Sequence, residues 1–238
     1  MRATTRYANV PVCELVCERL DRASVFDRFG IDYCCRGGRS LRRHCSMRHV
    51  ALDVVCHDLE ACDAQPVDHS QQDWQQAGPT ALIEHIRQTH HISLRQEIPR
   101  LRTLMHRVIA ARPVPPRWLR ELLEVITALS NHLRCHLLEE DHRLFPQIIR
   151  PADHAVTIHD SIERMTHEHE QIDETLERIR WLTADYQPPA DASPQLVELF
   201  DGLRRVEADL HRLMHKENNI LFPLALGQNI ETHEELSQ

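Results

Sequence analysis

From about residue 80 onward, apolar positions recur at alternating steps of three and four residues. This spacing is that of an α-helix with one buried face. Four such stretches follow one another, and short proline-containing segments separate them. They run over 91–108, 119–140, 158–179 and 196–220. The pattern predicts an all-α fold built around an up-down-up-down four-helix bundle with short connections.

The residues before this region have a different character. Seven of the eight cysteines lie before residue 63, among shorter helical patterns that surround the turn DYCCRGGRS. These short patterns cover about 10–29, 39–46 and 50–61. A polar stretch without periodicity follows, and it contains two prolines and a glycine, as linkers do. We therefore expect a small helical domain at 1–62, a linker at 63–79 and the bundle at 80–230.

Polar residues interrupt the apolar seams at one level of the predicted bundle. Three histidines hold the same heptad position on the first three helices, and the fourth helix has a leucine there. On the second and fourth helices a glutamate follows this position by four residues, on the same face and about 6 Å further along the axis. In chain order these residues are His91, His136 with Glu140, His169, and Leu213 with Glu217.

This polar layer favours a metal centre. A carboxylate inside a bundle is costly unless it is paired or bound to a metal. Any one of these histidines alone would more simply be a hydrogen-bonded core residue, but five converging residues suit a metal. Imidazole nitrogens mixed with carboxylate oxygens favour iron over an ion that prefers thiolates. Two glutamates from facing helices can bridge two ions about 3.5–4 Å apart.

The remaining histidines lie off the seams, and we expect most of them to be in solvent. His132 is four residues before His136 and either orients that ligand or belongs to the surface. The Pro of each Leu-Phe-Pro is expected to end or bend its helix. The histidines expected in solvent are His85, His90, His106, His159, His167, His211 and His215.

Cys34 and Cys35 are neighbours in the DYCCRGGRS turn. Adjacent Cα atoms are about 3.8 Å apart, below the usual 4.4–6.8 Å of a disulfide, so a bond between them would be strained. Arg36 and Arg39 would favour the thiolate forms. Two interpretations remain open on spacing alone. The pair has a redox, metal-handling or thiol-transfer role, or it consists of two small buried hydrophobes.

Composition and charge limit the classes of partner that we expect the protein to bind. The net charge is −8 and the isoelectric point about 6.1, which argues against a nucleic-acid surface. No run approaches the roughly 18–20 apolar residues of a membrane span, so we expect no membrane insertion. Glu14 and Glu18 interrupt the apolar stretch near the N-terminus, which does not fit an export signal. We expect a cytoplasmic protein whose cysteines are mostly reduced.

Several segments resemble one known family, the iron-sulfur cluster repair di-iron proteins. RASVFDRFGIDYCCRGGRSL at 22–41 is similar to the small N-terminal domain of this family. LIEHIRQTHH, CHLLEEDHRLFP, MTHEHEQID and KENNILFP are similar to the four ligand-bearing segments of its hemerythrin-like domain. The resemblance covers nearly the whole chain.

The resemblance implies a non-haem di-iron centre with a histidine from each helix and two bridging glutamates. Carried over, the ligands are the same five that the heptads select: His91, His136, Glu140, His169 and Glu217. The fourth histidine of the family corresponds to Leu213, and Arg36 is a second, milder departure. We therefore expect two iron ions, one of them coordinatively open and more weakly held.

The implied function is repair of iron-sulfur clusters damaged by nitric oxide or oxidants, by supplying iron, with Cys34 and Cys35 involved. The implied partners are damaged iron-sulfur proteins, with oxygen or nitric oxide as small ligands, and a homodimer is expected. This favours an iron-donating stress-response protein over a conventional turnover enzyme. Two alternatives stay open: a hemerythrin-like carrier or sensor of oxygen or nitric oxide, and a di-iron oxidoreductase acting on nitric oxide or peroxide.

Overall fold

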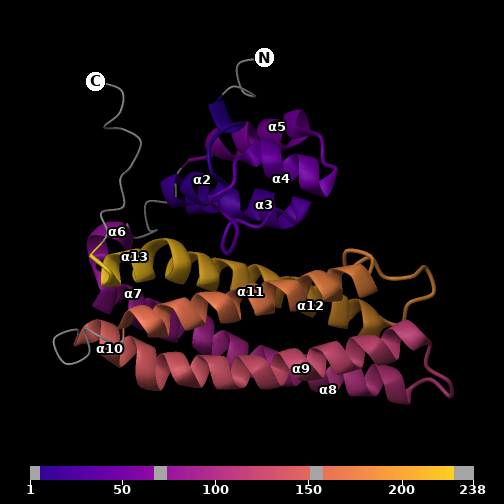
Figure 1. Ribbon diagram of the computed structural model, residues 1–238. Coiled ribbons are helices and arrows are strands. Elements are labelled where there is room, and N and C mark those ends of the chain that lie inside the picture. Colours follow the sequence, from indigo (N-terminus) through magenta and orange to yellow (C-terminus); the bar gives the residue numbers. More distant parts are fainter. Residues whose placement is uncertain (1–5, 67–73, 151–157, 228–238) are drawn as a thin grey trace. The chain divides into compact units, whose positions relative to one another are not determined.

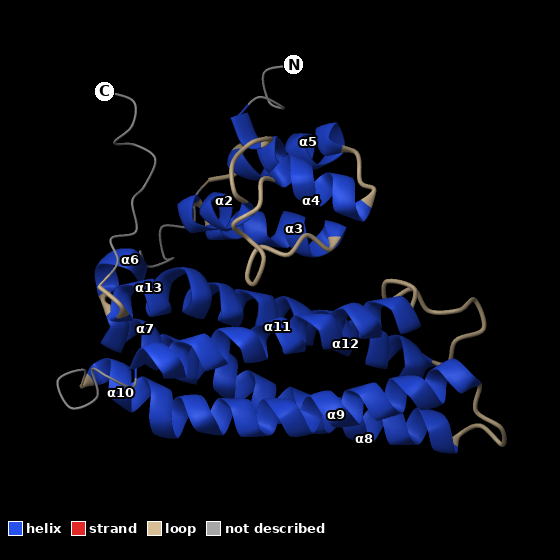
Figure 2. Cartoon of the chain, in the orientation of Figure 1, coloured by secondary structure: helices blue, strands red, loops and turns tan. Residues whose placement is uncertain are grey.

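The computed structural model describes residues 6–66, 74–150 and 158–227. Throughout these residues the regular elements are helices (Figure 2). One isolated β-bridge joins Pro11 and Ser40 within the described residues. The predicted all-α class is confirmed. The contacts group the chain into two units, which we call the cysteine-rich unit (1–82 with 211–238) and the bundle unit (83–210).

Four long helices form the bundle unit, lying side by side with alternating direction (Figure 1). The predicted four-helix bundle is thus confirmed. Gly202 allows the last helix to approach the first, because a Cβ there would lie 2.3 Å from the Leu101 side chain. The helices are α8 (Ile92–Ala110), α9 (Arg117–Glu139), α11 (Ile158–Leu182) and α12 (Pro194–Lys216), the last of which enters the cysteine-rich unit at His211.

Three of these helices change pitch through a π-helical turn, in which hydrogen bonds span five residues instead of four. The sequence suggested that Pro146 and Pro223 end or bend their helices, and the structure shows that neither ends its helix. Each sits in the first turn of the segment after a π turn, where its missing N–H is tolerated. The elements are α7 (Pro79–Ile86) with η2 (Arg87–His91), η3 (Glu140–Leu144) with α10 (Phe145–Ile149), and η5 (Glu217–Leu221) with α13 (Phe222–Ala225).

Short helices around an apolar core make up the cysteine-rich unit. The single pattern expected at 10–29 is divided into two α-helices with a short 3-10 helix before the second, because extended backbone at Arg19 interrupts it (φ −154°, ψ 106°). Arg22 then fixes this unit through a bidentate ion pair to Asp63, at 2.8 and 2.9 Å. The elements are α2 (Val12–Glu18), η1 (Leu20–Arg22), α3 (Ala23–Phe29), α4 (Leu41–Arg48), α5 (Leu52–Asp63) and α6 (Trp74–Ala77).

Part of the expected linker, residues 67–73, and the expected end of the bundle domain, 228–230, lie outside the described residues. Within the rest of the linker, Trp74–Ala77 is helical and Pro79 begins α7. Pro79 suits a first helical position because its N–H would have no partner there. None of the described helices is both long and apolar enough to cross a membrane.

Candidate metal centre

One carboxylate stands at the centre of the polar layer in the bundle unit. Both oxygens of Glu140 are fully buried, and each faces different imidazoles. Its Oε1 lies 3.2 Å from Nε2 of His136 and 3.7 Å from Nε2 of His169. Its Oε2 lies 3.3 Å from Nε2 of His91. Glu140 is thus a buried carboxylate with two imidazoles at one oxygen and a third at the other.

Local helix geometry brings these side chains together. His136 and Glu140 are four residues apart and so share one face of α9. Glu140 is the first residue of the π turn η3, and His91 is the last residue of η2. Such turns occur often at functional sites, because they redirect side chains without ending the helix. The ring of His91 also stacks on Phe145, with centroids 5.6 Å apart.

Glu217, in the cysteine-rich unit, has the same place relative to its π turn as Glu140 has. It is fully buried and begins the π turn η5, as Glu140 begins η3. Both turns run directly into a Leu-Phe-Pro. Leu213, one helical turn earlier, is buried as well. The structure thus gives the two glutamates the same local setting, which the repeated sequence had suggested.

The donor set suits a metal ion. The two oxygens of Glu140 and Nε2 of His136 are buried and have no hydrogen-bond partner among the described residues. Buried polar atoms in that state carry a desolvation cost of about 1–3 kcal/mol each, which a bound cation would remove. His136, Glu140 and His169 each offer a ligand atom, and these atoms lie within 4.8 Å of one another. Imidazole and carboxylate together fit iron.

The charges within the layer are mutually dependent. Burial raises the pKa of Glu140, but the surrounding imidazoles of His136, His169 and His91 outweigh it and hold that pKa well below its usual range. Burial lowers the pKa of His136, and the carboxylates of Glu140 and Glu168 outweigh it and raise that pKa to about 9. Glu140 is therefore ionised, as a metal ligand must be.

Two carboxylates that the sequence reasoning missed orient the histidines from outside. Oε2 of Glu168 lies 2.8 Å from Nδ1 of His136, and Oδ1 of Asp141 lies 3.3 Å from Nδ1 of His91. Carboxylates in this position fix the ring and direct its other nitrogen at the metal. Each is adjacent in sequence to a predicted ligand, but that position alone does not show which histidine the carboxylate contacts. His132 approaches the same group, with Nε2 3.9 Å from Glu168.

Glu168 is expected to act as a positioning residue. Glu168→Ala removes the acceptor from Nδ1 of His136, and metal affinity should fall about 10–100-fold. Glu168→Gln keeps an acceptor and should recover part of the loss. A competition titration with a metal chelator measures this effect. The control is Glu139→Ala, an equally half-buried carboxylate that pairs with Arg164 and Arg143. Equal affinities for the two alanine variants would contradict the role.

Three histidines predicted to be in solvent are in fact buried. His90 lies 2.6 Å from Asp209, and His211 lies 3.3 Å from Asp27 (Nδ1 to Oδ1 in both pairs). His215 is buried beside Tyr33, and burial lowers its pKa to about 4. The prediction was wrong because the heptad pattern identifies only the helix face that packs inside the bundle. A different face of the same helix can be buried by other residues, as Asp27 and Tyr33 bury His211 and His215. His106, His159 and His167 are exposed, as predicted, and His85 is half-buried.

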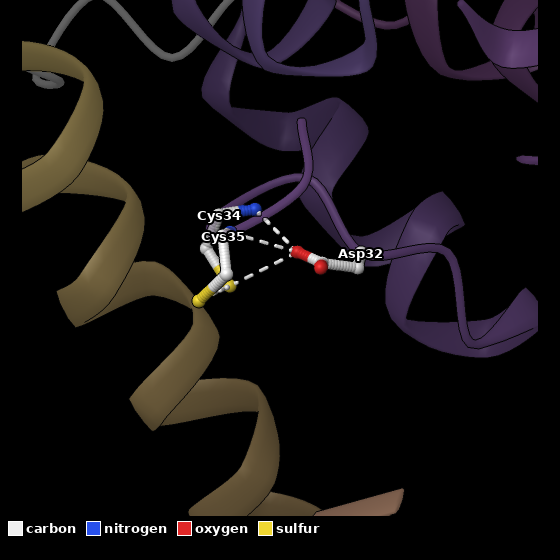
Figure 3. A group of neighbouring side chains, drawn as sticks. All are labelled: Asp32, Cys34 and Cys35. Carbon is white, nitrogen blue, oxygen red and sulfur yellow. Dashed lines mark hydrogen bonds between the residues drawn. The ribbon is translucent and has the colours of Figure 1, made fainter. Parts of the chain in front are cut away.

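The cysteine turn is built around Asp32 (Figure 3). Its carboxylate accepts the backbone N–H groups of Cys34, Cys35 and Arg36 at 2.9–3.0 Å, and the Cys34 thiol at 3.3 Å. Both cysteines are free thiols, with sulfurs 3.5 Å apart. The Cys34 thiol thus contacts a carboxylate. Arg39, expected to favour a thiolate, lies against Met47 instead.

A four-helix bundle with a buried layer of imidazoles and carboxylate defines a hemerythrin-type cation-binding protein. In agreement, the family model described as "Hemerythrin HHE cation binding domain" matches residues 81–225. A second model, described as a domain of unknown function (DUF542), matches residues 8–63.

Comparison with curated proteins gives the particular family. The chain is similar to the iron-sulfur cluster repair protein YtfE of Salmonella paratyphi B, Salmonella newport and Salmonella heidelberg. Each is 30% identical over 224 residues, which cover 93% of this chain and 98% of the relative. The chain belongs to this family of iron-sulfur cluster repair proteins, as its sequence motifs indicated.

Proposed function

We propose that this protein repairs damaged iron-sulfur clusters by supplying iron from a labile di-iron centre in its bundle. The observation that carries the proposal is the placement of Glu140. It is a fully buried, ionised carboxylate with imidazoles on both sides. The relatives, which match nearly the whole chain, are named as cluster repair proteins, and this favours repair over other uses of such a bundle.

The proposed ligands fall into two sets that share the glutamates. His136 and His169 would hold one iron and His91 the other, because they face different oxygens of Glu140. Glu217 is proposed as the second bridge, since it shares the heptad seam and the π-turn setting of Glu140. The bound iron supplies the transferable metal and the positions for small ligands. The protein residues hold it and exclude water from it.

Leu213 makes the two iron positions unequal. It stands where the pattern calls for a fourth histidine, and it offers no donor atom. Neighbouring side chains are poor substitutes: Met214 has a thioether that suits iron badly beside carboxylates. His211 and His215 contact Asp27 and Tyr33. The iron on the His91 side is therefore proposed to have one protein ligand fewer, and to be the one more readily given up.

The thiols of Cys34 and Cys35 are proposed to take part in repair. The turn that carries them is held by Asn218 and Asn219, which donate to the carbonyl oxygen of Cys34 at 3.2 and 3.3 Å. These asparagines directly follow Glu217 in the sequence. A proposed iron ligand and the thiols are thereby linked within the cysteine-rich unit, an arrangement that a simple oxygen carrier does not need.

The finer features of the proposal come from the family resemblance. We propose that the damage comes from nitric oxide or oxidants, that the clients are iron-sulfur proteins of the cytoplasm, and that the chain works as a homodimer. A donor of this kind gives up its metal once per loading and is not a conventional turnover enzyme. A carrier or sensor of oxygen or nitric oxide is the second candidate, because the position left by Leu213 could hold such a ligand.

Isotopic iron separates these functions. The chain is loaded with ⁵⁷Fe and added to an iron-sulfur enzyme whose cluster has been damaged with nitric oxide, and both activity and isotope are followed. We expect recovery, with ⁵⁷Fe appearing in the client. The Cys34→Ser/Cys35→Ser variant should be slower by about tenfold or more, while Cys135→Ser, an exposed cysteine of α9, should match the wild type.

Two results would reject this proposal. One is recovery without transfer of the isotope, which would point to chemistry at the bundle irons. The other is reversible binding of nitric oxide or oxygen with no recovery, which would identify a carrier. Recovery that is equal in the double serine variant would reject the role of the thiols alone.

A further inference from the structure

The side chains of Asp32, Cys34 and Cys35 converge within the cysteine-rich unit (Figure 3). Each offers one ligand atom, and these three atoms lie within 4.8 Å of one another. We propose that they form a second metal site, separate from the bundle centre, for a divalent cation that accepts thiolate ligands, such as Fe²⁺ or Zn²⁺. This site goes beyond the proposed function and does not depend on it.

The spacing matches a tetrahedral ion. Metal–sulfur bonds of about 2.3 Å and metal–oxygen bonds of about 2.0–2.2 Å give tetrahedral edges of about 3.8 Å between sulfurs and about 3.6 Å between sulfur and oxygen. The two sulfurs are 3.5 Å apart, and Sγ of Cys34 lies 3.3 Å from Oδ1 of Asp32. These two distances are each within about 0.3 Å of the tetrahedral values, and the third, between Sγ of Cys35 and the Asp32 carboxylate, is at most 4.8 Å.

Hydrogen bonds within the turn already hold one of the proposed ligands in place. Three backbone N–H groups hold the Asp32 carboxylate, from Cys34 and Cys35 to Oδ1 and from Arg36 to Oδ2. Gly37 closes the turn at close quarters, because a Cβ there would lie 2.5 Å from the Tyr33 carbonyl oxygen. A carboxylate whose position is fixed before the metal arrives is the feature of a preorganised ligand.

The choice of cation follows from the ligands. Two sulfurs exclude Mg²⁺ and Ca²⁺, which require oxygen ligands. Binding releases the thiol protons of Cys34 and Cys35, so two thiolates and one carboxylate surround a charge of +2. Asp32 and Cys34 are buried and Cys35 is half-buried, which leaves the approach on the Cys35 side. Three protein ligands leave a fourth position for an exchangeable group, as suits a labile site.

The proposed site lies against the segment that follows Glu217. The amide of Asn218 donates to the Cys34 carbonyl and lies 3.9 Å from Sγ of Cys35, where it would stabilise a thiolate. If the bundle gives up iron as proposed above, this site offers two thiolates that could accept it. That role, unlike the site itself, rests on the proposed function.

Titration of the full chain with Co²⁺ under anaerobic, reducing conditions tests the site. Thiolate ligands give Co²⁺ an intense charge-transfer absorption, whereas the imidazole and carboxylate ligands of the bundle do not. We expect this absorption in the wild type, with two protons released per ion. It should disappear in Cys34→Ser and in Cys35→Ser, and Asp32→Asn should raise the Kd about tenfold or more.

Matched variants keep the test decisive. Cys62→Ser alters another half-buried cysteine of the same unit and should leave the absorption unchanged. His136→Ala damages the bundle centre and should leave it unchanged as well. The serine variants keep Asp32 and its backbone hydrogen bonds, so circular dichroism should confirm their folding. A wild type without the absorption, or an absorption that survives in both serine variants, would overturn the proposal whatever the repair assay gives.

Discussion

Glu140→Ala is expected to abolish iron binding by the bundle, lowering the iron content to less than about a tenth of the wild-type value. Glu140 is the residue that faces His91, His136 and His169 at once, so its loss removes a ligand from both proposed iron positions. Second-sphere changes typically cost about 10–100-fold in metal affinity, and loss of a shared ligand should cost more.

Iron content and thermal unfolding check this prediction. Metal that binds only the folded state raises its stability in proportion to ln(1 + [L]/Kd), so iron should raise the Tm of the wild type. Glu140→Ala should lose this increment, and Glu140→Asp, which withdraws the carboxylate by one methylene, should keep part of it. The sequence neighbour Glu139 serves again as the control. Full iron content in Glu140→Ala would show that the centre is built on other residues.

Leu213→His is expected to have the opposite effect and to raise the affinity of the bundle for the second iron. The side chain is buried at the heptad position that carries a histidine on the other three helices. Histidine is close to leucine in volume and would add the missing nitrogen donor. We expect iron retention against a chelator to rise by about tenfold or more, and iron transfer to a client to slow accordingly.

The apo form of the same variant should be less stable. An imidazole that is buried without a partner costs about 1–3 kcal/mol, and metal binding should reverse this loss. Leu210→His is the matched control, because Leu210 is equally buried three residues earlier on the same helix. It should destabilise the protein without any gain in metal retention. If both variants held iron as the wild type does, the proposal that Leu213 leaves a ligand position open would be wrong.

The helices and the polar layer were predictable because both depend on periodicity. A histidine on an apolar seam, such as His136 or His169, can be recognised from spacing alone, and the structure places both against Glu140. The role of Glu168 could not be assigned in the same way. Its contact with His136 depends on how two helices are rotated against each other, which a single sequence does not specify.

Two other features of the structure were not predicted from the sequence. The burial of His211 and His215 depends on α3 and the cysteine turn, which are distant in sequence from α12. The Asp32 cap was within reach, since aspartate often accepts backbone N–H groups that follow it in a turn. Interactions between residues close in sequence could therefore be predicted, whereas contacts between elements distant in sequence could not.

The π turns divide each affected helix into two independently phased parts. Each turn adds one residue to the α-helical count, so the face presented after it is rotated by about 100° from the face before it. Of the two proposed ligands on α9 and η3, His136 precedes η3 and Glu140 begins it, whereas Phe145 is buried after it on the re-phased face. Phe222 stands in the same relation to η5. The apolar residues that pack at the end of the helix thus follow one helical phase, and the proposed ligands follow another. A substitution such as that at Leu213 can then alter the ligand pattern and leave the packing at the end of the helix intact.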